Sequence, residues 1–364
     1  MKNSLTKQLG IFTCLFALLF AFIPATGLAN ESELPEAQIY FDGKPYKTKY
    51  AMGNGHLLVP AQFLKHAGVL VDWDPKWRSV VFQAKGIKFA APVGEKFTDD
   101  YDRRTGTWKR GVLATEPFEF DGKVFIPLID VVRKLDMGVR YDAKSNRTYI
   151  TTNIPESKKL ISSVKSSKKL VALTFDDGPE DYYTPMILDV LKEKGVPATF
   201  FVMGEKVNQY PDMMKRIVNE GHSFGNHTWS HPNLKQSWSA DVRKEIQSTQ
   251  QVLERVIGKK SDLFRPPYGA VTKADRAALS QMGLRGIGWS VDTLDWSGMS
   301  AERILEIVRN QTAPGGIMLQ HNFQAGGLLD GTVEALPQII DELSAQGYTF
   351  VTIQTLLDSG EAVY

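Results

Sequence analysis

The chain has 364 residues, of which 43% are hydrophobic and 23% charged, so it is long enough for two domains with separate cores. Its 43 basic residues nearly balance its 41 acidic residues, and the excess comes from Lys2 and Lys7. A balanced charge of this kind argues against a nucleic-acid partner.

Residues 1–29 have the pattern of a secretory signal peptide, in which a positively charged start precedes an apolar run at 11–23 and small residues at 27–29. The apolar run has 13 residues, fewer than the about 20 that a membrane-spanning helix needs. The only cysteine, Cys14, lies in this run, so the mature chain has no disulfide. We therefore expect a bacterial protein that is secreted or cell-wall associated, with no transmembrane helix in the mature chain.

Residues 31–152 predict a small α+β domain with an internal duplication. The segment 57–60 (LLVP) precedes a helical pattern, Gly-Val, Trp-Asp and an apolar run, and 124–127 (VFIP) precedes a similar order about 67 residues later. Each half follows an Asp-Gly hairpin signal. The segment resembles the N-terminal domain of copper amine oxidases. The resemblance implies no copper chemistry, because His56 and His66 lie in separate elements without companion ligands.

We interpret this segment as an accessory domain, with cell-wall contact as a candidate role. Its aromatic residues are able to contact sugar rings, although core packing is the simpler interpretation. These aromatic residues are Trp73, Trp77, Tyr101 and Trp108.

Residues 153–169 are rich in serine and lysine and have the composition of a linker. The alternative is a basic strip that binds anionic wall polymers.

In residues 170–360, apolar strand runs alternate with helical patterns. The strand runs are 170–175, 198–203, 221–225, 262–265, 284–291, 315–320 and 348–353. The alternation predicts an α/β domain with about seven parallel strands in a distorted (β/α) barrel, whose chemistry lies at the carboxyl ends of the strands.

The first of these strand runs ends in Asp176 and Asp177, which are followed by Gly-Pro. Side chains alternate along a strand, so the two carboxylates point in different directions, and one can bind a metal while the other handles a proton. By itself, a strand followed by a polar turn is the more common explanation of such a pattern.

His227 and His231 are spaced i and i+4 in HTWSH. On a helical turn this spacing places both imidazoles on one face, although the pattern alone is a weak signal. With a carboxylate from the first strand they would form a two-histidine, one-carboxylate set. Such a set suits Zn²⁺, and Co²⁺ or Fe²⁺ are also able to bind it.

Three further motifs follow later strand runs, namely RPPYG at 265–269, DTLDW at 292–296 and IMLQH at 317–321. An arginine can orient a carboxylate, and a backbone N–H in a rigid loop can face a developing oxyanion. A histidine on a rim that also binds a metal is a candidate proton donor. Each motif alone has a purely structural explanation.

Together, TFDDGP, HTWSH, RPPYG, DTLDW and IMLQH resemble the NodB-homology polysaccharide deacetylases, carbohydrate esterase family 4, over about residues 168–360. The resemblance implies that Asp177, His227 and His231 bind one divalent metal ion, with Zn²⁺ preferred over Co²⁺ or Fe²⁺. It implies that Asp176 is the general base and that Arg265 tethers it.

The same resemblance implies that the backbone N–H of Tyr268 binds the oxyanion and that Asp295 orients His321, the general acid. It implies that Trp296 and Leu319 line the pocket for the acetyl methyl group. Members of the family often have aspartate after the last histidine, whereas this chain has asparagine at position 322, which bears on the tuning of the acid.

The expected function is that of a secreted metal-dependent hydrolase that removes N-acetyl groups from the amino sugars of a polysaccharide. Peptidoglycan is the preferred substrate, and a chitooligosaccharide or an exopolysaccharide is the alternative. A non-catalytic glycan-binding protein on the same scaffold is a further hypothesis, but it predicts a broken metal or acid position and none is broken. A last hypothesis assigns the main activity to the N-terminal domain, with the barrel as its support.

Overall fold

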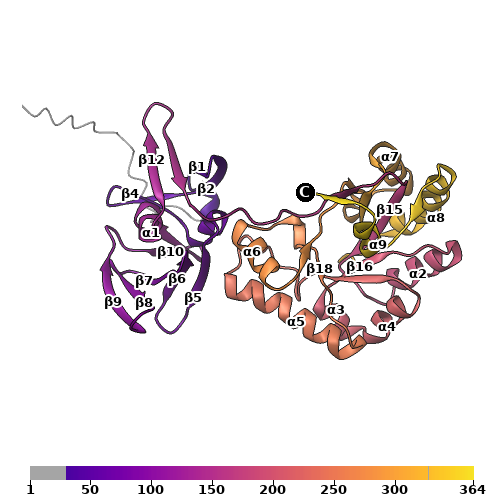
Figure 1. The fold of residues 1–364 in the computed structure, drawn as a ribbon, viewed down its shortest axis with the longest axis horizontal. Helices are drawn as coiled ribbons and strands as arrows, with labels where there is room; N and C mark the ends of the chain where they lie inside the picture. Colours follow the sequence, from indigo (N-terminus) through magenta and orange to yellow (C-terminus); the bar gives the residue numbers. More distant parts are fainter. Residues whose placement is uncertain (1–29, 327) are drawn as a thin grey trace, which may run out of the picture.

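The computed structural model describes residues 30–326 and 328–364, so the expected signal peptide lies outside the described residues. Figure 1 shows two lobes, an N-terminal one built mainly from strands and a C-terminal one in which helices surround a sheet. Within the described ranges, no helix is long and apolar enough to cross a membrane.

The N-terminal lobe contains three sheets. The first has the order β12 (Gly138–Asp142), β13 (Arg147–Thr151), β1 (Glu36–Phe41) and β2 (Lys44–Lys49). The second has the order β10 (Phe118–Phe120), β11 (Lys123–Pro127), β4 (His56–Pro60) and β3 (Ala51–Gly53). The third is an antiparallel meander of β5 (Leu70–Asp74), β6 (Ser79–Ala84), β7 (Ile87–Pro92), β8 (Phe97–Asp102) and β9 (Thr107–Val112).

The predicted duplication is visible in the order of these elements. Strand β4 leads into the 3-10 helix η3 (Ala61–Ala67) and the hairpin β5–β6, and β11 leads into α1 (Leu128–Lys134) and the hairpin β12–β13. The two equivalent strands pair with each other, with Val59 opposite Ile126. Both side chains are buried in the core of this lobe, so the two halves share one core.

The C-terminal lobe has a curled sheet, as predicted. Its parallel strands are β15 (Leu170–Asp176), β16 (Thr199–Val202), β17 (Ser223–Asn226), β18 (Leu263–Phe264), β19 (Arg285–Gly286), β20 (Val291–Asp292), β21 (Gly316–His321) and β22 (Thr349–Phe350). Its helices are α2 (Tyr183–Lys194), α3 (Gly204–Gln209), α4 (Pro211–Asn219), α5 (Ser239–Ile257), α6 (Lys273–Gln281), α7 (Ala301–Gln311), α8 (Asp330–Ala345) and α9 (Ile353–Asp358). Short 3-10 turns are η2 (Glu31–Glu33), η4 (Pro267–Gly269) and η5 (Asp295–Ser297).

Strand β15 lies near the middle of this sheet, and its residues after Leu170 are all buried. A parallel strand that is covered on both faces needs such an apolar sequence. The predicted strand run 284–291 instead forms the two short strands β19 and β20, which join different neighbours in the sheet. The barrel is therefore partly open on the β19 side.

The segment 153–169 is more ordered than its linker composition suggested. Strand β14 (Ser163–Lys165) pairs antiparallel with β21 and with β23 (Glu361–Val363). Ile161 forms an isolated parallel bridge with Ile287. The C-terminal part of the segment therefore belongs to the sheet of the C-terminal lobe.

The interpretation of the N-terminal aromatic residues as core was partly wrong. Trp77 and Trp108 are 67% and 48% exposed, respectively. Trp73 stacks on Trp238 of the other lobe with ring centroids 6.0 Å apart. Beside this contact, the Val71 N–H donates to Ser239 Oγ at 3.0 Å, so β5 packs against the start of α5.

Candidate active site

The motif residues meet at the carboxyl ends of the strands because neighbouring parallel strands are in register. Asp176, the last residue of β15, lies opposite His321, the last residue of β21. Asn226 ends β17 beside Phe264 of β18, so the residues that follow each of them, His227 and Arg265, emerge side by side. One rim of the sheet thus collects side chains that are far apart in the sequence.

Asp177, His227 and His231 form a group in which the candidate ligand atoms all lie within 4.8 Å of one another. Asp177 Oδ1 is 3.2 Å from Nε2 of His227 and 3.3 Å from Nε2 of His231. No other such group of His, Cys, Asp or Glu was found among residues 30–326 and 328–364. The predicted carboxylate and imidazoles are therefore close enough to share one ion.

The prediction of a helical turn for HTWSH is wrong. Residues 227–231 form no helix, and Thr228 and His231 have positive φ angles of 68° and 60°. Glu245 of α5 fixes this loop, because its Oε2 accepts hydrogen bonds from the backbone N–H groups of Trp229 and Ser230, each at 2.8 Å. The imidazoles converge because the loop turns back on itself.

The chemistry of this group fits a divalent cation. Asp177 Oδ1 is buried and has no hydrogen-bond partner among the described residues, although two imidazole nitrogens face it. His227 Nδ1 lies 2.7 Å from the Arg265 carbonyl oxygen, so Nδ1 carries a proton and Nε2 is the nitrogen that faces Asp177. Burial lowers the pKa of His227, but Asp176 and Asp177 raise it overall, so a cation that binds Nε2 displaces a proton there. Burial and the neighbouring His227 lower the pKa of His231, which favours the neutral imidazole that a metal requires.

Asp176 is held at one oxygen only. Arg265 donates from Nη1 to Asp176 Oδ1 at 2.7 Å and to Thr174 Oγ1 at 2.7 Å, and from Nη2 to the Gly288 carbonyl at 2.9 Å. Both Arg265 and Asp176 are buried. The other oxygen, Oδ2, lies 3.9 Å from His227 Nε2 and faces the ligand group. This geometry leaves Asp176 Oδ2 available for proton transfer.

His321 is paired with Asp295 through two contacts. Asp295 Oδ1 lies 2.7 Å from His321 Nδ1, and Asp295 Oδ2 accepts the His321 backbone N–H at 2.8 Å and the Thr332 hydroxyl at 2.9 Å. Burial lowers the pKa of His321, but the charge and the hydrogen bond of Asp295, together with the charges of Asp177 and Asp176, outweigh burial and raise this pKa to about 9. His321 is therefore protonated at neutral pH.

The three remaining predicted site residues are Tyr268, Trp296 and Leu319, which the structure places in η4, η5 and β21. Tyr268 has a positive φ of 59°, its side chain is 68% exposed, and its ring meets that of His231 edge-on at 4.7 Å. Trp296 is 46% exposed, whereas Leu319 is buried in β21. The last two residues offer an exposed aromatic wall and a buried apolar contact.

Asn322 is fully buried and lies under the first motif. Its Oδ1 accepts the Gly178 N–H at 3.0 Å, and its Nδ2 donates to Thr184 Oγ1 at 3.0 Å. Its backbone N–H donates to the Asp176 carbonyl at 3.0 Å. The departure from the usual aspartate thus acts on the Asp-Asp-Gly turn rather than on His321.

The sequence interpretation missed several supporting residues. These residues are Glu245, Gly288, Thr332 and Thr184. Each holds a motif residue or Asn322 by a hydrogen bond, but none has a recognisable spacing from its partner in the sequence. Their roles depend on tertiary contacts, so only the structure could reveal them.

Two different protein families match the two halves of this chain. The family model for polysaccharide deacetylase matches residues 163–287, and the model for the copper amine oxidase N-terminal domain matches residues 36–150. A peptidoglycan-N-acetylglucosamine deacetylase of Bacillus cereus is 43% identical over 195 residues, which are 54% of this chain and 70% of that protein. The chain belongs to the polysaccharide deacetylase family.

The share of the similar protein that is matched differs from one relative to the next. The peptidoglycan-N-acetylmuramic acid deacetylase PdaC of Bacillus subtilis is 38% identical over 194 residues, which are 53% of this chain and 40% of that protein. Among solved structures, the Bc1960 peptidoglycan N-acetylglucosamine deacetylase has a TM-score of 0.53 at 42% identity, covering 55% of this chain and 93% of that one. Each of these two matches covers slightly more than half of this chain.

One of the similar solved structures extends over most of this chain. It is a mutant of BA3943, described as a family 4 carbohydrate esterase pseudoenzyme with restored activity. It is 26% identical, with a TM-score of 0.53 over 82% of this chain and 97% of that one. The family therefore includes a protein described as a pseudoenzyme. Membership of the family alone does not establish activity, so activity depends on whether the candidate active site of this chain has all of its expected residues.

Proposed function

We propose that this chain is a secreted, divalent-metal-dependent hydrolase that removes N-acetyl groups from the amino sugars of peptidoglycan. The observation that carries the proposal is that a ligand group, a tethered carboxylate and a paired imidazole all lie on one rim of the sheet. An inactive glycan-binding protein would not need all of these at once. The candidate ligand group lies in the C-terminal lobe, which argues against the N-terminal lobe as the main catalyst.

Asp177, His227 and His231 would hold the cation, which when bound polarises the acetamide carbonyl and lowers the pKa of the attacking water. Asp176 accepts the proton of that water through Oδ2, because its Oδ1 is occupied by Arg265. The same hydrogen bond from the guanidinium holds the Asp176 carboxylate in place and prevents it from rotating into the ligand group.

His321 donates a proton to the departing amine from Nε2, since Nδ1 is held by Asp295. A positioned acid of this kind contributes about 10²–10⁴-fold to a rate. The backbone N–H of Tyr268 faces the developing oxyanion, and one such donor contributes about 10²–10³-fold. Trp296 and Leu319 enclose the acetyl methyl group.

The choice of peptidoglycan is supported by the described activities of the Bacillus relatives. A chitooligosaccharide is the second candidate, because a chitooligosaccharide deacetylase of Rhizobium leguminosarum bv. trifolii is 36% identical over 193 residues, which are 50% of this chain and 90% of that protein. An exopolysaccharide is a further alternative. Secretion is supported by the pattern of residues 1–29.

The test is to incubate the chain with purified peptidoglycan and with N-acetylated chitooligosaccharides and to measure released acetate. We expect acetate from peptidoglycan, loss of release with EDTA, and recovery with Zn²⁺, Co²⁺ or Fe²⁺. Release from chitooligosaccharides alone would favour the second candidate. A metal-loaded chain that releases no acetate from either glycan would be a binding protein.

A further inference from the structure

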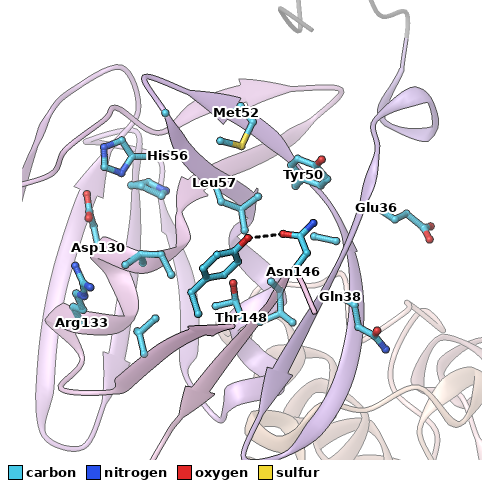
Figure 2. A pocket seen from close by; sticks show the side chains of 17 residues that line it. Glu36, Gln38, Tyr50, Met52, His56, Leu57, Asp130, Arg133, Asn146 and Thr148 are labelled. Atoms are coloured by element: carbon cyan, nitrogen blue, oxygen red, sulfur yellow. Dashed lines mark hydrogen bonds between the residues drawn. The ribbon is translucent and has the colours of Figure 1, made fainter. Parts of the chain in front are cut away.

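The N-terminal lobe has a hollow of its own, with a volume of about 560 Å³. Figure 2 shows that it lies between the two four-stranded sheets and helix α1. Every residue that lines it lies between positions 36 and 148, so it is separate from the candidate active site. Neither the motifs nor the proposed mechanism uses it.

The hollow has an apolar and aromatic lining. Ile39, Leu57 and Val139 come from the core side, and Tyr141 and Met52 are 53% and 40% exposed at its opening. Large apolar side chains with this exposure are usually covered when they gather at one concave site. The lining therefore offers flat apolar surface to a ligand.

Polar groups surround this surface. Tyr141 donates its hydroxyl proton to Asn146 Oδ1 at 2.8 Å, the bond drawn in Figure 2, which leaves the Asn146 amide N–H₂ unused. The side chains of Gln38, His56 and Arg133 line the hollow, and no hydrogen bond or ion pair joins them to any other described residue. These groups offer donors and acceptors that the chain itself does not satisfy.

This combination discriminates between ligand classes. A single arginine lies with the carboxylates of Glu36 and Asp130, which disfavours a strongly anionic ligand. The polar rim disfavours a lipid chain. A pyranose ring has an apolar face that packs on an aromatic ring, and its edge carries hydroxyl and acetamide groups that need donors and acceptors.

From this lining we infer that the hollow is a second glycan-binding site for a chain of N-acetylated amino sugars. The choice of this glycan rests on the proposed function, because the same molecule would hold a polymer both here and at the metal rim. Each single contact is weak, but joining two sites in one chain raises the apparent affinity for a polymer by about 10²–10⁴-fold when both can bind together.

The consequence is a difference between long and short substrates. Loss of the hollow lowers turnover of insoluble peptidoglycan through a higher apparent KM. It leaves turnover of a short N-acetylated oligosaccharide unchanged, because such a ligand occupies only the metal rim. A substitution that merely damaged the fold would lower both.

The variants are Tyr141→Ala and Arg133→Ala, and the matched control is Trp77→Ala. Trp77 is also a large exposed aromatic residue of this lobe, 67% exposed, and it does not line the hollow. Binding is measured on the full chain in EDTA, by co-sedimentation with peptidoglycan and by calorimetric titration with glycan strands freed of peptide. We expect glycan binding to become at least about tenfold weaker for Tyr141→Ala. The control Trp77→Ala should bind the glycan as strongly as the unmodified chain.

Binding that survives both substitutions, or that follows the wall peptides rather than the glycan, would overturn the inference. Because EDTA removes the reaction from the measurement, the outcome is independent of catalysis. A chain that releases no acetate yet loses glycan binding on Tyr141→Ala would support this site and refute the proposed function.

Discussion

Lys65 Nζ of the N-terminal lobe lies 2.9 Å from Asp275 Oδ1 of the C-terminal lobe, and both side chains are buried. The same ammonium group donates to the carbonyl oxygens of Leu234 at 2.6 Å and Ser237 at 2.9 Å. Leu234 and Ser237 belong to the loop that follows His231, and Asp275 begins the helix that follows RPPYG. One lysine therefore fastens two loops of the candidate active site to the other lobe.

Replacing Lys65 by methionine should reduce the free energy of unfolding by about 3–5 kcal/mol, because a buried carboxylate and two carbonyl groups lose their partner. Urea denaturation of the full chain measures this change. The matched control is Lys194→Met, because Lys194 pairs with Asp341 at 2.7 Å on the surface of the C-terminal lobe. An exposed pair of this kind contributes about 0–1 kcal/mol. Equal losses for the two variants would contradict the role assigned to Lys65.

The burial of Lys65 between the lobes could not be predicted from the sequence. In AQFLKHAG it looks like a solvent-facing residue of an amphipathic helix, and its partner lies about 210 positions later in the chain. The strand and helix alternation was predictable because burial on both faces imposes an apolar sequence. A contact between lobes imposes no comparable pattern.

The same contrast holds within the candidate site. Asp177, His227 and His231 were identifiable because metal chemistry restricts the residue types. The loop between the histidines was predicted as helical and is not, since its conformation depends on Glu245 from a separate helix. Local spacing therefore indicated which residues meet but not how the backbone brings them together.

Replacing Asn322 by aspartate, the residue common in the family, should destabilise this chain. The buried carboxylate would lose the hydrogen bond from Nδ2 to Thr184 and stand beside Asp176, at a cost of about 1–3 kcal/mol near neutral pH. Burial would raise its folded-state pKa above the unfolded value of about 3.9. The folded state then binds more protons, so the loss of stability grows as pH rises and shrinks as pH falls.

Urea denaturation at pH 5 and pH 8 would measure this dependence, with Asn153→Asp as the control. Asn153 is exposed and already has a positive φ of 53°, a conformation that aspartate also tolerates. Its substitution should change stability by less than about 0.5 kcal/mol at either pH. A pH-independent loss for Asn322→Asp would show that the new carboxylate is not the cause.

Replacing Asp295 by asparagine should move the basic limb of the pH–rate profile to lower pH. Asp295 raises the pKa of His321 to about 9, so the acid form persists through neutral pH and is lost as pH rises through that value. Without the Asp295 carboxylate, only Asp177 and Asp176 oppose the effect of burial, so the pKa of His321 falls. The measurement is kcat/KM against pH with a defined N-acetylated oligosaccharide.

Asp292→Asn in the same motif is the matched control for this shift. Asp292 Oδ1 accepts the Leu294 N–H at 3.1 Å, which an asparagine oxygen can also do, and Asp292 is not among the groups that shift His321. The control should keep the basic limb in place. If Asp295→Asn lowered the rate without moving the limb, His321 would not be the acid that titrates there.

Asp176→Asn and His227→Ala should separate metal binding from proton transfer. Asparagine at 176 still accepts a hydrogen bond from Arg265 but cannot take a proton from water, so acetate release should fall by about 10²–10⁴-fold or more with metal content unchanged. Alanine at 227 removes a nitrogen that faces Asp177 Oδ1 at 3.2 Å, so both metal and activity should be lost. Metal content after dialysis and acetate release, measured on the same samples, distinguish the two effects. Full activity in Asp176→Asn would refute its assignment as the base, and retention of metal in His227→Ala would refute the shared site.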